Sequence, residues 1–204
     1  MVVAMRCGCG NVRGEVALAR AYTRGTCYCR DCQAYARWLG RAELMDACGG
    51  SDIVPMSPAG VRITAGLQHV ACMSLSGKGT LRWYAACCRT PLGNTPRSAK
   101  LAYLGLPVAC LDAAADDVDR AAGRRDRLVL NAGSATCEVR PTPFAFLLGG
   151  VAIFAHVVAA RLRAPPPSPF VDGAGRRLRI PVVLTAAERD ALGANPSRRP
   201  SVDN

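Results

Sequence analysis

The chain has 204 residues and half of them are apolar, which is enough to bury a core and excludes wholesale disorder. Its formal net charge of +11 comes almost entirely from scattered arginines, and no cationic run exceeds two residues, which argues against a nucleic-acid-binding stripe. Residues 1–5 are too few for the apolar region of a signal peptide. The eleven cysteines therefore predict reduced thiols in the cytoplasm, some of them bound to metal, and no secreted disulfide scaffold.

Short apolar segments that are rich in β-branched and aromatic residues predict strands in the first hundred residues. These segments are residues 16–18, 61–64, 70–75 and 80–84. Residues 76–79 predict a hairpin turn between the last two. Residues 31–39 predict a helix, with Asp31 as its N-cap and Gly40 as its stop. This part of the chain is therefore expected to be mainly β.

The remainder of the chain is expected to be helical or irregular. Residues 111–127 predict a surface helix or connector, and residues 164–169 a stiff proline linker. Thr185 and Glu188 are spaced like a capping box at the start of a helix over residues 185–192. The polar tail from residue 195 predicts disorder.

Residues 144–160 form an apolar segment whose only polar side chain is His156. Thr142-Pro143 before it is a good helix start. Its 17 residues reach only the lower edge of what a bilayer requires, and Gly149 and Gly150 weaken a membrane-spanning interpretation. A buried core helix, or one packed against a partner, is the favoured interpretation, with His156 packed and neutral if buried.

Three groups of cysteines are spaced to bind metal: Cys7 with Cys9, then Cys27, Cys29 and Cys32, then Cys87 with Cys88. A pair of thiolates on a tight turn can chelate one tetrahedral zinc, and two such turns brought together complete a closed, structural site. Gly8 and Gly10 supply the conformational freedom that the first turn needs.

The middle group, Cys27, Cys29 and Cys32, has three thiols within six residues. All three can bind one zinc and leave its fourth position to water, substrate or a distant residue, which is the mark of a catalytic site. Arg24 and Arg30 are nearby cations that favour the thiolate form. The alternative is that Cys48, Cys72 or Cys87 closes the site, which would then be structural.

The order and spacing of these motifs resemble the glutathione-dependent formaldehyde-activating enzyme family, which includes the CENP-V proteins. The motifs are Cys7-x-Cys9-Gly10, Cys27-x-Cys29-x-x-Cys32, Arg82-Trp83-Tyr84 and Cys88-Arg89-Thr90-Pro91-Leu92, and they cover about residues 5–95. The resemblance implies a β-tent of small antiparallel sheets built around two zinc ions, with Cys27, Cys29 and Cys32 on the catalytic one. It implies a zinc-dependent carbon–sulfur lyase that acts on a thiol adduct such as that of glutathione with formaldehyde.

One departure from the family pattern concerns the structural zinc. Ala85 stands where the pattern has a cysteine, and Arg89 replaces its glycine. Cys7, Cys9 and Cys88 remain, and Cys87 is the only local candidate for the fourth ligand. Adjacent side chains on an extended strand point to opposite faces, so either the turn distorts or this site is weak or empty.

The sequence thus predicts a zinc-binding β-tent domain over residues 1–105, an unmatched helical extension over 106–194 and a tail over 195–204. The favoured function is the lyase, with a small thiol such as glutathione as partner; the alternative is a non-catalytic, zinc-stabilised protein-binding module. The fourth ligand of the middle group separates the two. The other candidates have ordinary roles: Trp83 and Tyr84 are expected to fill the core, and Cys110 and Cys137 to be isolated, buried apolar residues.

Overall fold

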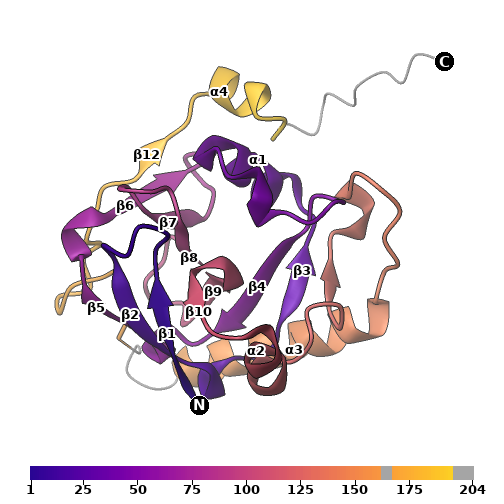
Figure 1. Ribbon diagram of the computed structural model, residues 1–204, viewed down its shortest axis with the longest axis horizontal. Helices are drawn as coiled ribbons and strands as arrows, with labels where there is room; N and C mark the ends of the chain where they lie inside the picture. The colour runs from indigo at the N-terminus through magenta and orange to yellow at the C-terminus, as the bar shows by residue number, and fades with distance from the viewer. Residues whose placement is uncertain (162–166, 195–204) are drawn as a thin grey trace.

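The computed structural model describes residues 1–161 and 167–194, which form a mainly β protein with two sheets and a few helices (Figure 1). The strands are β1 Val2–Arg6, β2 Arg13–Ala17, β3 Gly25–Cys27, β4 Ser51–Met56, β5 Val61–Ala65, β6 Val70–Ser74, β7 Leu81–Ala85, β8 Pro91–Thr95, β9 Leu104–Pro107, β10 Leu111–Asp112, β11 Val129–Leu130 and β12 Val182–Val183. The four segments predicted as strands correspond to β2, β5, β6 and β7.

The smaller sheet has the order β10-β1-β2-β5, and its described pairs are antiparallel. Side chains alternate along β2, so that Val16 is buried while its neighbour Glu15 is exposed. This period of two is what a sheet with one covered face requires. One apolar core draws on both sheets, with Met5 and Val16 from the smaller and Trp83 and Leu104 from the larger.

The larger sheet has the order β11-β3-β4-β9-β8-β7-β6-β12. Its inner pairs are antiparallel, and the predicted turn between β6 and β7 is present, with the Gly79 amide donating to the Ser76 carbonyl. Both edge strands come from the second half of the chain: β11 pairs in parallel with β3, and β12 pairs in parallel with β6. The sheet is therefore mixed.

The α-helices are α1 Arg30–Leu39, α2 Ala115–Ala122, α3 Pro143–Arg161 and α4 Ala186–Ala191. The short 3-10 helices are η1 Leu18–Arg20, η2 Ala42–Leu44, η3 Pro58–Gly60, η4 Leu67–His69, η5 Val108–Cys110 and η6 Ala132–Ser134. The predicted N-cap of the first helix is wrong. Cys29 is the N-cap of α1, its sulfur accepts the Cys32 amide, and Asp31 lies inside the first turn. Gly40 ends the helix as predicted, in the left-handed region with φ 65°.

The segment predicted as a buried core helix is the helix α3, but it lies on the surface. Figure 1 shows it along one edge of the molecule, and its 18-residue apolar window is 0% buried. By length and composition alone it is the one helix, among the described residues, that could cross a membrane. His156 is packed as expected, since its ring stacks on that of Tyr22 with centroids 4.6 Å apart, but the residue is exposed rather than buried.

The chain beyond α3 returns to the same core. The ring of Phe170 is buried and stacks on Trp83, with centroids 4.5 Å apart. Thr185 and Glu188 form the predicted capping box of α4. Half of the predicted proline linker, residues 164–166, and the predicted disordered tail lie outside the described residues. Residues on both sides of α3 thus belong to one packed unit.

Candidate metal centres

The first of two cysteine clusters, the four-cysteine cluster, joins Cys7 and Cys9 after β1 to Cys87 and Cys88 after β7. All four sulfur atoms lie within 4.8 Å of one another. The Sγ of Cys9 lies 3.2 Å from that of Cys87, and the Sγ of Cys7 lies 3.6 Å from that of Cys9 and 3.9 Å from that of Cys87. Four sulfurs on one tetrahedral zinc, each ~2.3 Å from the metal, would be ~3.8 Å apart. The cluster therefore has the size of a metal site.

The turn between β7 and β8 explains how adjacent cysteines meet. Residues 86–88 form a turn, with the amides of Cys88 and Arg89 both donating to the Ala85 carbonyl. Arg89 has φ 56°, the left-handed conformation that a glycine adopts more readily. Because neither cysteine is on an extended strand, the alternation that made Cys87 doubtful does not apply. Ala85, at the position of the missing cysteine, is fully buried in β7.

Hydrogen bonds prepare the sulfur of Cys88 for a ligand's role. Partial burial opposes ionisation, but the Thr90 hydroxyl 3.2 Å away and the amides of Cys9 and Thr90 lower the pKa of Cys88 to about 6. Burial, and then the sulfurs of Cys9 and Cys7, raise the pKa of Cys87 to about 12. Without a nearby cation, the four sulfur atoms stabilise additional negative charge poorly. A bound metal ion would supply the positive charge.

The second cluster, the three-cysteine cluster, consists of Cys27, Cys29 and Cys32, whose sulfurs also lie within 4.8 Å of one another. Cys27 ends β3, Cys29 caps α1 and Cys32 lies in the first turn of that helix. The Cys29 sulfur accepts the Cys32 amide at 3.3 Å. The N-terminus of a helix stabilises thiolates through its free amides and its dipole. The local fold thus brings three potential ligands to one point.

Arg82 on β7 is the cation of this cluster, a role that no sequence pattern indicated. Its side chain is buried, and its guanidinium lies over the Tyr35 ring, 4.9 Å from the centroid. Hydrogen bonds from Cys27 and Cys29 lower the pKa of Cys32 against the effect of burial, and Arg82 lowers it further through charge and a hydrogen bond. A hydrogen bond with Cys29 lowers the pKa of Cys27, but the Cys32 sulfur and then burial outweigh it and raise that pKa to about 11. The sulfurs of Cys27 and Cys32, and then burial, raise the pKa of Cys29. Cys32 is the preferred thiolate.

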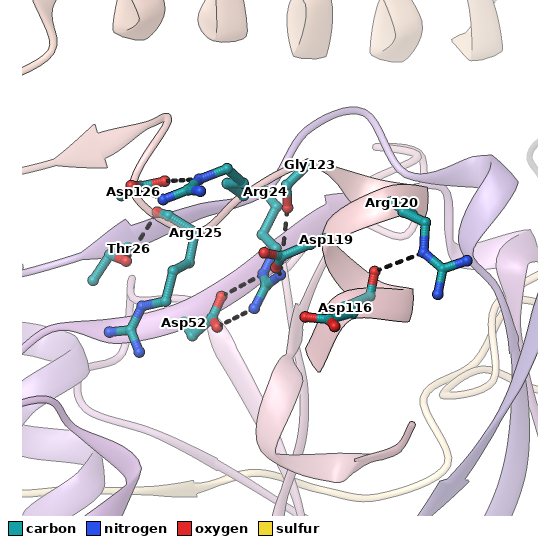
Figure 2. Close-up of polar contacts among 10 residues, drawn as sticks. Arg24, Thr26, Asp52, Asp116, Asp119, Arg120, Gly123, Arg125 and Asp126 are labelled. Carbon is teal, nitrogen blue, oxygen red and sulfur yellow. Dashed lines mark hydrogen bonds and ion pairs between the residues drawn. The ribbon is translucent and has the colours of Figure 1, made fainter. Parts of the chain in front are cut away.

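Arg24, expected to support these thiolates, is engaged elsewhere. Its guanidinium makes two hydrogen bonds to Asp52, of 2.7 and 3.0 Å, and also pairs with Asp119 on α2. Figure 2 shows it between these two carboxylates, with the Gly123 carbonyl as a further acceptor. Arg24 therefore ties β4 to α2, and its role at the cysteines was wrongly assigned.

A cavity of about 270 Å³ adjoins the three-cysteine cluster on the side of Cys32. Cys32, Tyr35, Arg82 and Asn94 contribute to its lining. Asp52 also lines it and is held by Arg24. A space of this size is near the lower end of small-molecule sites, which begin at ~300 Å³. One cysteine of the cluster and the buried Arg82 thus both contribute to the lining of this space.

None of the three cysteines considered as a closing ligand joins the three-cysteine cluster. Cys87 belongs to the four-cysteine cluster, and Cys72 is buried in the apolar core. Cys48 forms a disulfide with Cys137, so the expectation that all thiols are reduced, and that Cys137 is isolated and buried, is wrong for this pair. Cys110 is isolated and fully buried as predicted.

The disulfide holds the segment that covers the Cys27 side of the cluster. In that segment, the Asn131 side chain donates to the Cys27 sulfur at 3.6 Å. The Ser134 carbonyl accepts from the Gln33 side chain at 2.8 Å. The three-cysteine cluster is thus covered on one side and adjoins the cavity on the other.

Taken together, the fold and the site define a mainly β protein with two cysteine clusters that can each hold a metal ion. The chain belongs to a family of unknown function, DUF6151, whose profile matches residues 1–137. That match includes every residue of both clusters and the disulfide.

No match to the chain is found among curated proteins. A crystal structure of a Rhodobacter sphaeroides protein is 17% identical, with a TM-score of 0.39, over 54% of this chain and 89% of that chain. A likeness at that level carries no argument about fold or function.

Proposed function

We propose that both clusters bind zinc and that the zinc of the three-cysteine cluster is a reactive centre. Thiolate-only donor sets favour zinc among the common divalent ions, and the sulfur spacing fits a tetrahedral ion. The four-cysteine cluster would be a closed, structural site. The three-cysteine cluster lacks a fourth Cys, His, Asp or Glu ligand within residues 1–161 and 167–194, which leaves one position for a substrate.

The observation that carries the proposal is that Cys32 and its cationic partner Arg82 both line the same cavity. A buried guanidinium needs an anionic partner, because an uncompensated charge is costly to bury. Cys32 is such a partner, and a negatively charged substrate in the cavity would be another. The favoured substrate is therefore a small thiol that carries a negative charge, of which glutathione is an example.

Zinc bound at the three-cysteine cluster would supply a Lewis acid that keeps a substrate thiol ionised at neutral pH. The chain's own residues would orient it: Arg82 attracts the anionic thiol, while Tyr35 and Asn94 fix the position of Arg82. In a carbon–sulfur lyase reaction, the thiolate sulfur bonds to the carbonyl carbon of an aldehyde and a proton ends on the carbonyl oxygen. The reverse reaction breaks the same bond. We propose this reaction class, which the motif resemblance also implies.

Cobalt substitution tests the proposal directly. The visible spectrum of the cobalt protein should change when glutathione is added, because a thiolate enters the coordination sphere. Cys29→Ser should abolish the change, while Cys110→Ala, which removes a buried sulfur outside both clusters, should preserve it. The wild-type zinc protein should also accelerate adduct formation between glutathione and formaldehyde. A fully metallated protein without either effect would favour the alternative, a zinc-stabilised protein-binding module.

A further inference from the structure

The surface of α3 is rich in exposed apolar side chains, which belong to neither cysteine cluster. Seven of its large apolar side chains are between 40% and 73% exposed. They are Phe144, Phe146, Leu147, Leu148, Val151, Phe154 and Val158. Monomeric soluble proteins rarely expose so many large apolar groups together, and such patches mark interaction sites.

The helix contacts its own domain through small residues. Gly149 is buried, and Ala145 and Ala152, four and three residues away, are half-buried on the same side. A Cβ at position 149 would lie 3.2 Å from the side chain of Leu128, so the helix lies close to its own domain at this point. The large side chains therefore project away from the protein. Figure 2 shows α3 passing above α2 and the Arg24 network.

The fold prevents this helix from spanning a bilayer. A helix of 19 residues is ~28 Å long, close to the ~30 Å thickness of the hydrocarbon core. However, β11 before it and β12 after it both pair within the same sheet. Pro167 already lies on the domain, where it lines a surface pocket with Arg97 and Ser98. The six residue steps from Arg161 to Pro167 reach at most ~21 Å, too short to return across the hydrocarbon. The helix can only lie in the plane of a surface.

The charges beside α3 indicate which surface this is. From residue 139 to residue 171 the sequence has three cations, Arg140, Arg161 and Arg163, and no acidic residue. They flank the apolar segment at both ends, in a chain with a formal net charge of +11. Anionic lipid headgroups complement this arrangement, because cations beside an apolar face strengthen interfacial binding. A second copy of the chain would instead bring like charges together.

We propose that α3 docks the protein on the surface of an anionic bilayer. The helix lies in the interfacial plane, its large side chains enter the headgroup–acyl boundary to a depth of ~5–10 Å, and its small-residue side stays on the protein. Arg140, which is exposed just before the helix, contacts the headgroups. The reactive centre proposed above plays no part in this inference, which depends on α3 alone.

Vesicle flotation with the full chain tests the proposal. Wild-type protein should float with vesicles of phosphatidylcholine and phosphatidylglycerol, and less with phosphatidylcholine alone. The triple variant Leu147→Gln, Val151→Gln, Phe154→Gln should lose at least about a hundredfold in partitioning, because three apolar side chains no longer enter the lipid. A matched triple variant on exposed apolar residues elsewhere, Leu67→Gln, Ile180→Gln and Val182→Gln, should bind like wild type.

Three results would overturn the proposal. The first is that the wild-type protein does not float, while light scattering shows the wild type to be a dimer and the α3 triple variant to be a monomer. A second copy of the chain would then cover the helix. The second is equal flotation with both kinds of vesicle. The third concerns depth: in Phe154→Trp, bromines near the headgroup should quench the added fluorescence, and quenching only by bromines at the bilayer centre would contradict an in-plane helix.

Discussion

The two cysteine clusters differ in how far apart their cysteines lie in the sequence. The four-cysteine cluster joins residues 7–9 to residues 87–88, so it fastens the loop after β1 to the turn after β7. The three-cysteine cluster comes from residues 27–32, at the end of one strand and the start of one helix. The first has the form of a clamp between distant segments. The second is held by local structure and adjoins a cavity, which leaves it available for chemistry.

The groups that stabilise the thiolates also differ between the two clusters. A threonine hydroxyl and backbone amides support Cys88, whereas the buried guanidinium of Arg82 and a helix N-terminus support Cys32. Neutral hydrogen-bond donors suffice for a structural ligand. A buried positive charge beside a cavity can also attract an anionic molecule. The following predictions are designed to separate the two clusters experimentally.

The largest effect should follow Cys88→Ser. Because zinc in a structural site contributes its binding energy to folding, the free energy of unfolding should fall by more than about 3 kcal/mol and one zinc should be lost. Urea denaturation and elemental analysis measure the two changes. As a control, Cys110→Ala should cost about 1 kcal/mol and leave the metal content unchanged. Equal losses in both variants would show that the four-cysteine cluster binds no metal.

Cys137→Ser should have the next largest effect. The disulfide with Cys48 closes a long loop, with a sequence separation of 89, and its removal should cost ~2–4 kcal/mol. It should loosen the cover of the three-cysteine cluster while the four-cysteine cluster keeps its metal. Thermal unfolding with and without reductant checks this. The wild type should be sensitive to reductant and the variant insensitive, and wild-type insensitivity would show that the disulfide is absent.

Cys29→Ser should remove one metal ion with little loss of stability. Serine is a favourable N-cap, so its hydroxyl can replace the sulfur that accepts the Cys32 amide. The free energy of unfolding should fall by no more than about 1 kcal/mol, because residues 27–32 are close together in the unfolded chain too, and metal binding there contributes less to folding than binding between distant segments. Zinc content and urea midpoint, compared with those of Cys88→Ser, measure the contrast. A global loss of structure would mean that the local site also holds the fold together.

The smallest expected effect is a pH dependence of the metal-free protein. The folded pKa of Cys88 is about 6, below the ordinary thiol value of 9.0, so its stabilising effect is complete above the unfolded pKa and is lost as the pH falls through about 6. The pKa of Cys87 is raised to about 12, so above pH 9.0 its thiol ionises in the unfolded chain before it does so in the folded protein. The effect of Cys87 is therefore to lower the free energy of unfolding above pH 9.0. The urea midpoint should rise between about pH 6 and 8.5. Cys88→Ser should reduce this rise, to which Cys32 also contributes because its pKa is lowered too, and an unchanged profile would contradict the assignment.

Local chemistry made part of this structure predictable. Short apolar segments rich in β-branched and aromatic residues identified β2, β5, β6 and β7, and the Thr185–Glu188 spacing identified the start of α4. These features depend on neighbours a few residues apart. The grouping of the cysteines was also indicated by spacing, including the pair Cys87 and Cys88.

The remaining features depend on contacts between distant residues. The cationic partner of Cys32 is Arg82 rather than the nearby Arg24, because β7 carries Arg82 to the cluster while Asp52 and Asp119 hold Arg24. The Cys48–Cys137 disulfide has no local signature. The exposure of α3 was missed because an apolar segment has the same sequence pattern whether it packs in a core or faces outward.

X-ray absorption at the zinc edge tests the central claim, which is that a closed and an open thiolate site coexist in one chain. Seven cysteines on two ions, four in one cluster and three in the other, predict an average of 3.5 sulfur ligands per zinc and an additional light-atom ligand. Cys29→Ser should retain one zinc with four sulfurs. Four sulfurs on each of two ions in the wild type, or a folded protein without zinc, would contradict the account.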